Sequence, residues 1–229
     1  MRKRIILRIT LMLFLGLNGL NAQTSANECT IKYNLFKGDY QSKKYDEAFP
    51  NWMYLMDNCP KLSINVYKLG DKLVQSMFKK ATDKTETAAL IKRIYTQRLE
   101  NYPTKDPAKV HSDYATFLSK NNLATDAEIF KILELAYSID PTRMGVKNIY
   151  KYFQGITDTY KDTNPQKVFD TYDDVLESVG KKLEDYAKKR KKINDKLELG
   201  QELDKREKQN LRAYTVNSKA LGQVESGLD

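Results

Sequence analysis

The stretch KKYDEAFPNWMYLMDNCP, residues 43–60, carries the pattern of an amphipathic helix with a marked end. Four small or apolar side chains recur along it at spacings of three and four: Ala48, Trp52, Leu55 and Met56. Proline cannot continue a helix interior, so Pro60 places the end of the predicted helix, 45–58, just before it. Ala48 lets the paired helix that precedes it, 29–42, approach closely, and Trp52 fills the space one turn later. The stretch therefore predicts a helix that packs on a partner through this face.

The same helical period runs through the chain after Glu28. Glycine and proline are sparse, and β-branched residues do not alternate, so the sequence predicts an all-α fold. Pro60, Pro103 and Pro141 each close an amphipathic run, at intervals of 43 and 38 residues. Each interval holds two helical patterns separated by a polar link, so the repeating object is a helix hairpin. The predicted helices are 29–42, 45–58, 62–81, 85–101, 106–120, 125–138, 142–160, 165–198 and 203–228.

The opening stretch resembles the second helix of a tetratricopeptide repeat, a family of 34-residue helix hairpins. The segment IFKILELAYSIDP, 129–141, is similar to the same helix, and the Leu-Gly pair at 69–70 is typical of a first helix. Two departures are Phe36, where a small residue is usual, and Pro50, which is expected to bend its helix. The resemblance covers residues 29–178 and implies a helix-hairpin solenoid with degenerate repeats. The alternative is a non-repeating helical bundle.

Beyond residue 178 the composition changes. Residues 179–229 are rich in charge, with only a thin apolar line, which predicts long charged helices or a loose coiled coil. Gly200 offers a place for the chain to turn back. The apolar seam then runs to residue 228 without a helix stop, so we expect this segment to continue beyond residue 229.

Residues 1–22 have the layout of a secretory signal peptide, because basic residues precede a short apolar run from Ile9 to Leu17. No later segment approaches the roughly 20 apolar residues that a membrane-spanning helix needs. Cleavage after Ala22 would leave a short N-terminal segment, 23–28, ahead of the first hairpin; the alternative is an uncleaved anchor. We expect an exported protein in the periplasm of a Gram-negative bacterium, with association with the outer membrane left open.

Removal of that peptide lowers the formal net charge from +9 to +5, because it contains four basic residues and no acidic ones. Much of the basic character thus belongs to the export signal, and we expect no nucleic-acid partner. His111 is the only histidine, Cys29 and Cys59 do not have metal-binding spacing, and no glycine-rich phosphate loop occurs. The sequence predicts no catalytic residues, no metal and no cofactor, and therefore a protein that is not an enzyme.

Two surfaces are candidates for binding. The resemblance implies that first helices of successive hairpins line a groove, where aromatic side chains could anchor a partner. The side chains placed there are Tyr33, Lys37, Tyr40, Tyr67, Asp71 and Tyr114. The second candidate is a basic patch on the long charged helix, formed by Lys181, Lys182, Lys188, Lys189, Arg190, Lys191 and Lys192. A solvated helix face is the alternative interpretation of that patch.

The repeat register also implies a disulfide. Cys29 opens the first helix and Cys59 closes the second, and two antiparallel helices bring that start and that end together. Export would place both thiols where a disulfide can form and persist.

We expect a non-catalytic scaffold that binds envelope proteins or peptides in its groove, with peripheral contact to a membrane or cell wall left open. The alternative is the helical arm of a larger enzyme, or of a cell-wall or outer-membrane structural protein, whose active or anchoring domain follows residue 229. The sequence does not specify an oligomeric state.

Overall fold

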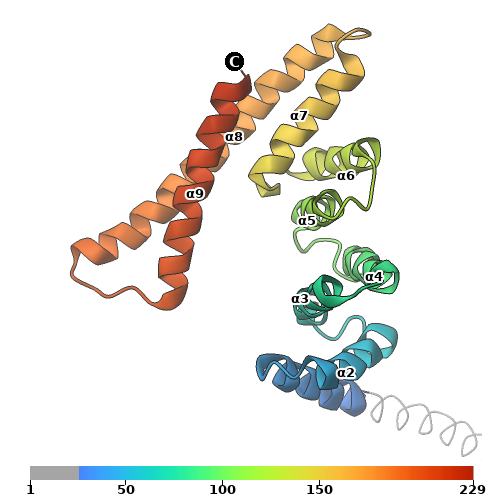
Figure 1. Cartoon of the computed structure of the whole chain (residues 1–229). Helices are drawn as coiled ribbons and strands as arrows, with labels where there is room; N and C mark the ends of the chain where they lie inside the picture. Colours follow the sequence, from blue (N-terminus) through green and yellow to red (C-terminus); the bar gives the residue numbers. More distant parts are fainter. Residues whose placement is uncertain (1–25, 229) are drawn as a thin grey trace, which may run out of the picture. The chain divides into compact units, whose positions relative to one another are not determined.

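The computed structural model describes residues 26–228, and all regular secondary structure in that range is helical (Figure 1). The all-α prediction is confirmed, while the predicted signal peptide lies outside the described residues. A first helix covers residues 26–41. It is followed by α2 (Tyr45–Asn58), α3 (Ile64–Lys80), α4 (Thr85–Asn101), α5 (Pro107–Lys120), α6 (Asp126–Ile139), the 3₁₀ turn η1 (Pro141–Arg143), α7 (Val146–Tyr160), α8 (Pro165–Glu198) and α9 (Lys205–Leu228).

The predicted boundaries agree with these helices to within three residues, with one exception. The predicted helix 142–160 is interrupted, because η1 and an extended Gly145 precede α7. The cause is local: the Asp140 carboxylate accepts hydrogen bonds from the backbone and the hydroxyl of Thr142, at 2.9 and 2.6 Å. An aspartate bonded to the chain two residues ahead favours a tight turn over a continuing helix.

The chain divides after Pro103 into two compact units. The first contains helix 26–41 and α2 to α4. Its core is made of side chains with no exposed surface, including Phe36, Trp52, Leu55, Leu73 and Ile91. Phe36, which departs from the repeat pattern, is therefore a core residue. The helix α2 continues through Pro50.

Trp52 joins α2 to α3. Its indole Nε1 donates a hydrogen bond to the Val66 carbonyl oxygen at 3.0 Å, so the buried N–H has a partner. Gly70 lies against the same ring, and a Cβ atom there would sit 2.1 Å from Nε1. The glycine is needed because any larger residue would collide with the indole. Trp52 was expected between the first two helices; it is buried, and its ring packs on α3, the first helix of the following hairpin.

The second unit begins with α5, α6 and α7, which pack on one another in sequence order. A buried polar contact joins α5 to α7, because the Asn148 amide donates to the Ser112 carbonyl at 2.7 Å and to its hydroxyl at 2.8 Å. Between α6 and α7, the Phe130 ring lies on Gly155, where a Cβ atom would be 2.2 Å from the ring. Both units thus place an aromatic ring of a second helix on a glycine of the next helix.

The helix α8 is 34 residues long and contacts α7, η1 and α9. Its buried side chains Val175 and Val179 lie in the first half, and the buried Ile193 lies in the second. The loop 199–204 then reverses the chain, with Gly200 at φ +72°, where glycine carries no Cβ penalty. The predicted start of the charged segment, residue 179, falls inside α8, so no break in structure marks it.

Candidate functional site

The predicted groove begins with Tyr33, a half-buried side chain on helix 26–41. Its hydroxyl accepts hydrogen bonds from the Asn65 amide at 3.3 Å and from the Ser63 hydroxyl at 3.5 Å, both at the start of α3. Tyr33 therefore brings together the first helices of two successive hairpins. This contact fixes the phenol and leaves part of its ring exposed.

The prediction that Tyr67 lines the groove is wrong. Tyr67 has no exposed surface, and its hydroxyl donates to the Pro60 carbonyl at 2.8 Å and accepts from the Asn101 amide at 3.1 Å. Its ring meets Tyr102 edge-on at 5.8 Å between centroids. Burial raises the pKa of Tyr67 to about 12, because the phenolate would lose its hydration. This tyrosine holds α3 and the end of α4 together.

The other predicted groove residues of the first unit differ in exposure. Lys37 is exposed on helix 26–41, and Tyr40 is half-buried, with its ring 5.8 Å from that of Tyr45. Asp71 on α3 is half-buried and accepts a hydrogen bond from the Gln75 amide at 2.9 Å. Tyr33, Lys37, Tyr40 and Asp71 thus keep accessible surface.

In the second unit the predicted groove residue is Tyr114, which is half-buried on α5. Burial raises its pKa above the ordinary value for tyrosine. His111, one turn earlier, is also half-buried, and burial lowers its pKa. Neither residue belongs to a group of metal-ligating side chains, since no cluster of three or more His, Cys, Asp or Glu occurs within residues 26–228.

The basic patch of α8 is largely neutralised by its own helix. Four of its lysines lie within 2.5–2.8 Å of a carboxylate one turn away: Lys181 with Glu177, Lys188 with Glu184, Lys189 with Asp185 and Lys191 with Asp195. Pairs at this spacing support the helix itself, and solvent screens them because both partners are exposed. The remaining Arg190 and Lys192 are half-buried and exposed, respectively, and neither has an ion pair within the described residues.

The placement of Lys182 in this exposed patch is wrong. Only 7% of its surface is exposed, and its ammonium donates a hydrogen bond to the Thr142 carbonyl of η1. Burial, together with the nearby positive charge of Arg143, lowers the pKa of Lys182 to about 8. Arg143 itself forms an ion pair with Asp106, which precedes α5. Lys182 therefore ties α8 to the turn after α6.

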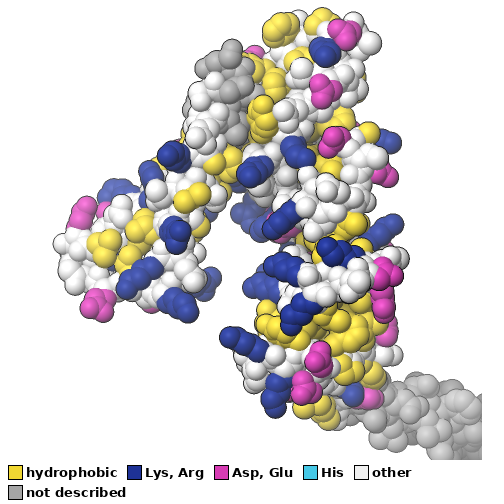
Figure 2. All heavy atoms as spheres, in the orientation of Figure 1, with side chains coloured by type: hydrophobic (Ala, Val, Ile, Leu, Met, Phe, Trp, Pro, Cys, Tyr) yellow, Lys and Arg dark blue, Asp and Glu magenta, His cyan; other side chains and the backbone are white. Residues whose placement is uncertain are grey.

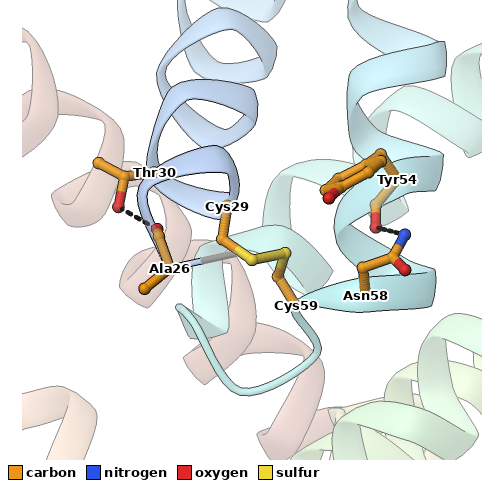
Figure 3. Close-up of a disulfide and its surroundings, with 6 residues drawn as sticks. All are labelled: Ala26, Cys29, Thr30, Tyr54, Asn58 and Cys59. Carbon is orange, nitrogen blue, oxygen red and sulfur yellow. Dashed lines mark hydrogen bonds between the residues drawn. A yellow bond between two sulfur atoms is a disulfide. The ribbon is translucent and has the colours of Figure 1, made fainter. Parts of the chain in front are cut away.

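The expected disulfide is present. Cys29 and Cys59 are bonded, with their Cα atoms 5.9 Å apart and a sequence separation of 30 (Figure 3). It joins the first turn of helix 26–41 to the residue that follows α2. Beside it, Lys32 lies over the Tyr54 ring at 5.4 Å, a second contact between the same two helices.

A pocket of about 270 Å³ lies between α6 and α7. Its walls combine apolar Ile129, Phe130 and Leu133 with polar Asp126, Lys151, Gln154 and Asp158. The Lys151 ammonium already donates to the Ser119 hydroxyl at 2.6 Å.

Sequence reasoning missed Asn101, Tyr102, Ser112 and Asn148, which make contacts between helices. The only signal for Asn148 was its place on the apolar face of α7, between Val146 and Ile149.

Among the described residues, no helix combines the length and the apolar character needed to cross a bilayer. Comparison with known proteins found no matching family, no similar curated protein and no similar solved structure.

Proposed function

We propose that the chain is an exported, non-catalytic scaffold of tetratricopeptide type, which binds envelope proteins or peptides along the first helices of its hairpins. The observation that carries the proposal is contact between first helices within each unit. Tyr33 bonds to the start of α3, and Asn148 of α7 bonds to Ser112 of α5. Such contacts align the first helices side by side, as a shared binding face requires.

The second helices also contact one another. Arg93 of α4 donates to the Met56 carbonyl at 3.2 Å and pairs with Asp57 of α2 at 2.5 Å. Within each unit neighbouring helices pack on one another, and α5 also contacts α7, which is consistent with stacked hairpins. The repeated use of an aromatic ring on a glycine, Trp52 on Gly70 and Phe130 on Gly155, supports a common origin of the two pairs.

Export is supported by two independent features. The leader-like residues 1–22 have the charge and apolar pattern of a secretory signal, and the Cys29–Cys59 disulfide suits an oxidising compartment. The polar groups that remain accessible on the first helices, Tyr33, Lys37 and Tyr40, suit a peptide partner. Aromatic rings supply contact area with few torsions to freeze.

Site-specific photo-cross-linking in intact cells tests the proposal. A photoreactive residue at Lys37, on the first-helix face, should give discrete protein adducts. The matched control is Glu47, an exposed position on the second helix α2. Equal adducts at both positions, or none at Lys37 under conditions that trap known envelope complexes, would contradict the groove.

A further inference from the structure

Most of the exposed positive charge of the α8–α9 hairpin without an ion pair among the described residues lies on α9. Between residues 205 and 219 the only carboxylate is Glu207, and it forms an ion pair with Lys196 of α8 at 2.5 Å. The outer side of α9 carries four basic side chains, all exposed and without an ion pair within the described residues: Lys205, Lys208, Arg212 and Lys219. We call these four residues the α9 stripe.

The stripe is straight. Its members are separated by three, four and seven residues, so they share one face of the helix, and Val216 completes the row. Fourteen residues at 1.5 Å each give a row about 21 Å long. Lys205, Lys208 and Arg212, with Gln209, line one shallow depression. Figure 2 shows Lys and Arg side chains gathered along this hairpin.

The opposite face of α9 is occupied. The Tyr214 ring stacks on Tyr186 of α8 at 5.6 Å, and Leu221 has no exposed surface. Because its apolar side packs on α8, α9 presents the stripe on the side turned away from α8.

Exposed apolar side chains accompany the stripe. Leu199, in the loop at the hairpin tip, is 75% exposed, the highest value among the large hydrophobic side chains of the described residues. Leu197 is 48% exposed at the end of α8, and Val216 is 58% exposed within the stripe itself. Basic residues combined with exposed aliphatic ones are the composition that binds the interface of a membrane.

We propose that the α9 stripe and the hairpin tip form a peripheral docking site for a bilayer that contains anionic lipid. The lysines and the arginine contact headgroups, while Leu199 enters the headgroup region. A flat surface can touch every member of a straight row at once. The exposed leucines favour a bilayer over an acidic protein, since they gain from an apolar environment as well as from charge. This site does not depend on the groove proposed above.

Vesicle co-sedimentation tests the site with the chain starting at Gln23, so that the apolar run 9–17 does not contribute. Vesicles of phosphatidylcholine alone are compared with vesicles that also contain phosphatidylglycerol. We expect binding only to the anionic vesicles, and weaker binding as salt rises from about 0.1 M to about 1 M, where the Debye length falls from ~10 to ~3 Å.

Two variants with equal net charge locate the site. One carries Gln at Lys205, Lys208, Arg212 and Lys219; the other carries Gln at Lys181, Lys188, Lys189 and Lys191. Each loses four positive charges, and circular dichroism checks that each is folded. A surface cation is worth roughly fivefold in partition to an anionic membrane, so the α9 variant should lose at least 50-fold. The α8 variant should lose less than tenfold, because its lysines are already paired.

The outcomes are distinct. Leu199→Gln should weaken binding severalfold, including the part that persists at high salt. Equal loss in the two charge variants would overturn the site, because it would show a response to net charge alone. Absence of vesicle binding would overturn it as well. Binding of polyglutamate through the stripe without vesicle binding would assign the surface to an acidic protein instead.

Discussion

The Gly70→Ala substitution tests the packing of α2 on α3. The added Cβ atom would lie 2.1 Å from Trp52 Nε1 and 2.6 Å from Cε2, closer than any real contact, in a region with no exposed surface. The indole must move, which costs about 1–3 kcal/mol for overpacking. Movement also breaks its hydrogen bond to Val66, which costs a further 1–3 kcal/mol or so. Alanine has a higher helix propensity than glycine, and this offsets only about 1 kcal/mol of the loss in stability.

The net loss of stability is about 3 kcal/mol. Trp52 is the only tryptophan of the chain, so its fluorescence in urea reports on the first unit alone. With a slope of about 2 kcal/mol per molar urea, the midpoint should fall by about 1.5 M.

The matched control is Gly38→Ala in helix 26–41, where an added Cβ atom meets nothing within 4 Å. It should raise the free energy of unfolding by about 0.5–1 kcal/mol, because alanine favours a helix over glycine. A Gly70→Ala midpoint equal to or above that of Gly38→Ala would refute the packing described here.

Two further predictions concern cross-links between helices. Replacing both Cys29 and Cys59 with serine should lower the free energy of unfolding of the first unit by about 3–4 kcal/mol on a chain-entropy model. The same urea titration measures it. Two reactive thiols in the unfolded, unreduced wild type would contradict the disulfide. The second concerns Lys182, whose pKa is lowered from 10.5 to about 8 by folding. Between these two values the unfolded chain binds more protons than the folded chain, so the free energy of unfolding should rise with pH across that window. Below pH 8 the full cost of burying the charged ammonium is present. Calorimetry of the wild type and Lys182→Met should show a difference in free energy of unfolding that is constant below pH 8 and changes in favour of the wild type from pH 8 to 10; a constant difference throughout would refute it.

Helix positions were predictable because prolines and apolar spacing are local signals. Pro60 and Pro103 follow the observed ends of α2 and α4 by two residues each. The prediction of one helix over 142–160 failed since η1 depends on the Asp140 side chain, which competes with helical hydrogen bonds over only three residues.

Side-chain roles were harder to predict, because they depend on partners far apart in sequence. Tyr67 stands at a position expected to face the groove, yet its hydroxyl forms hydrogen bonds with the Pro60 carbonyl and the Asn101 amide. For Lys182 a signal existed: it follows Val175 and Val179 at helical spacing, which places it on the buried face of α8. Lys182 was predicted in the exposed patch because only its charge, and not its place on the helix, was considered.

The α9 stripe was equally visible in the sequence as a spacing of basic residues. Its meaning required knowledge of which face of α9 packs on α8. That contact shows that Glu207 faces α8, whereas Lys208 and Arg212 face away from it.

The length of α8 has a mechanical consequence. At 1.5 Å per residue its 34 residues form a helix about 50 Å long. α7 packs on one half of it and α9 on the other. Its interior contains no proline, and its one glycine, Gly180, lies within the helix. With no hinge between the two halves, a load applied at the loop 199–204 is carried as leverage to the α7 contact. We therefore expect the hairpin to behave as a stiff spacer that keeps its tip at a fixed distance from the α5–α7 helices.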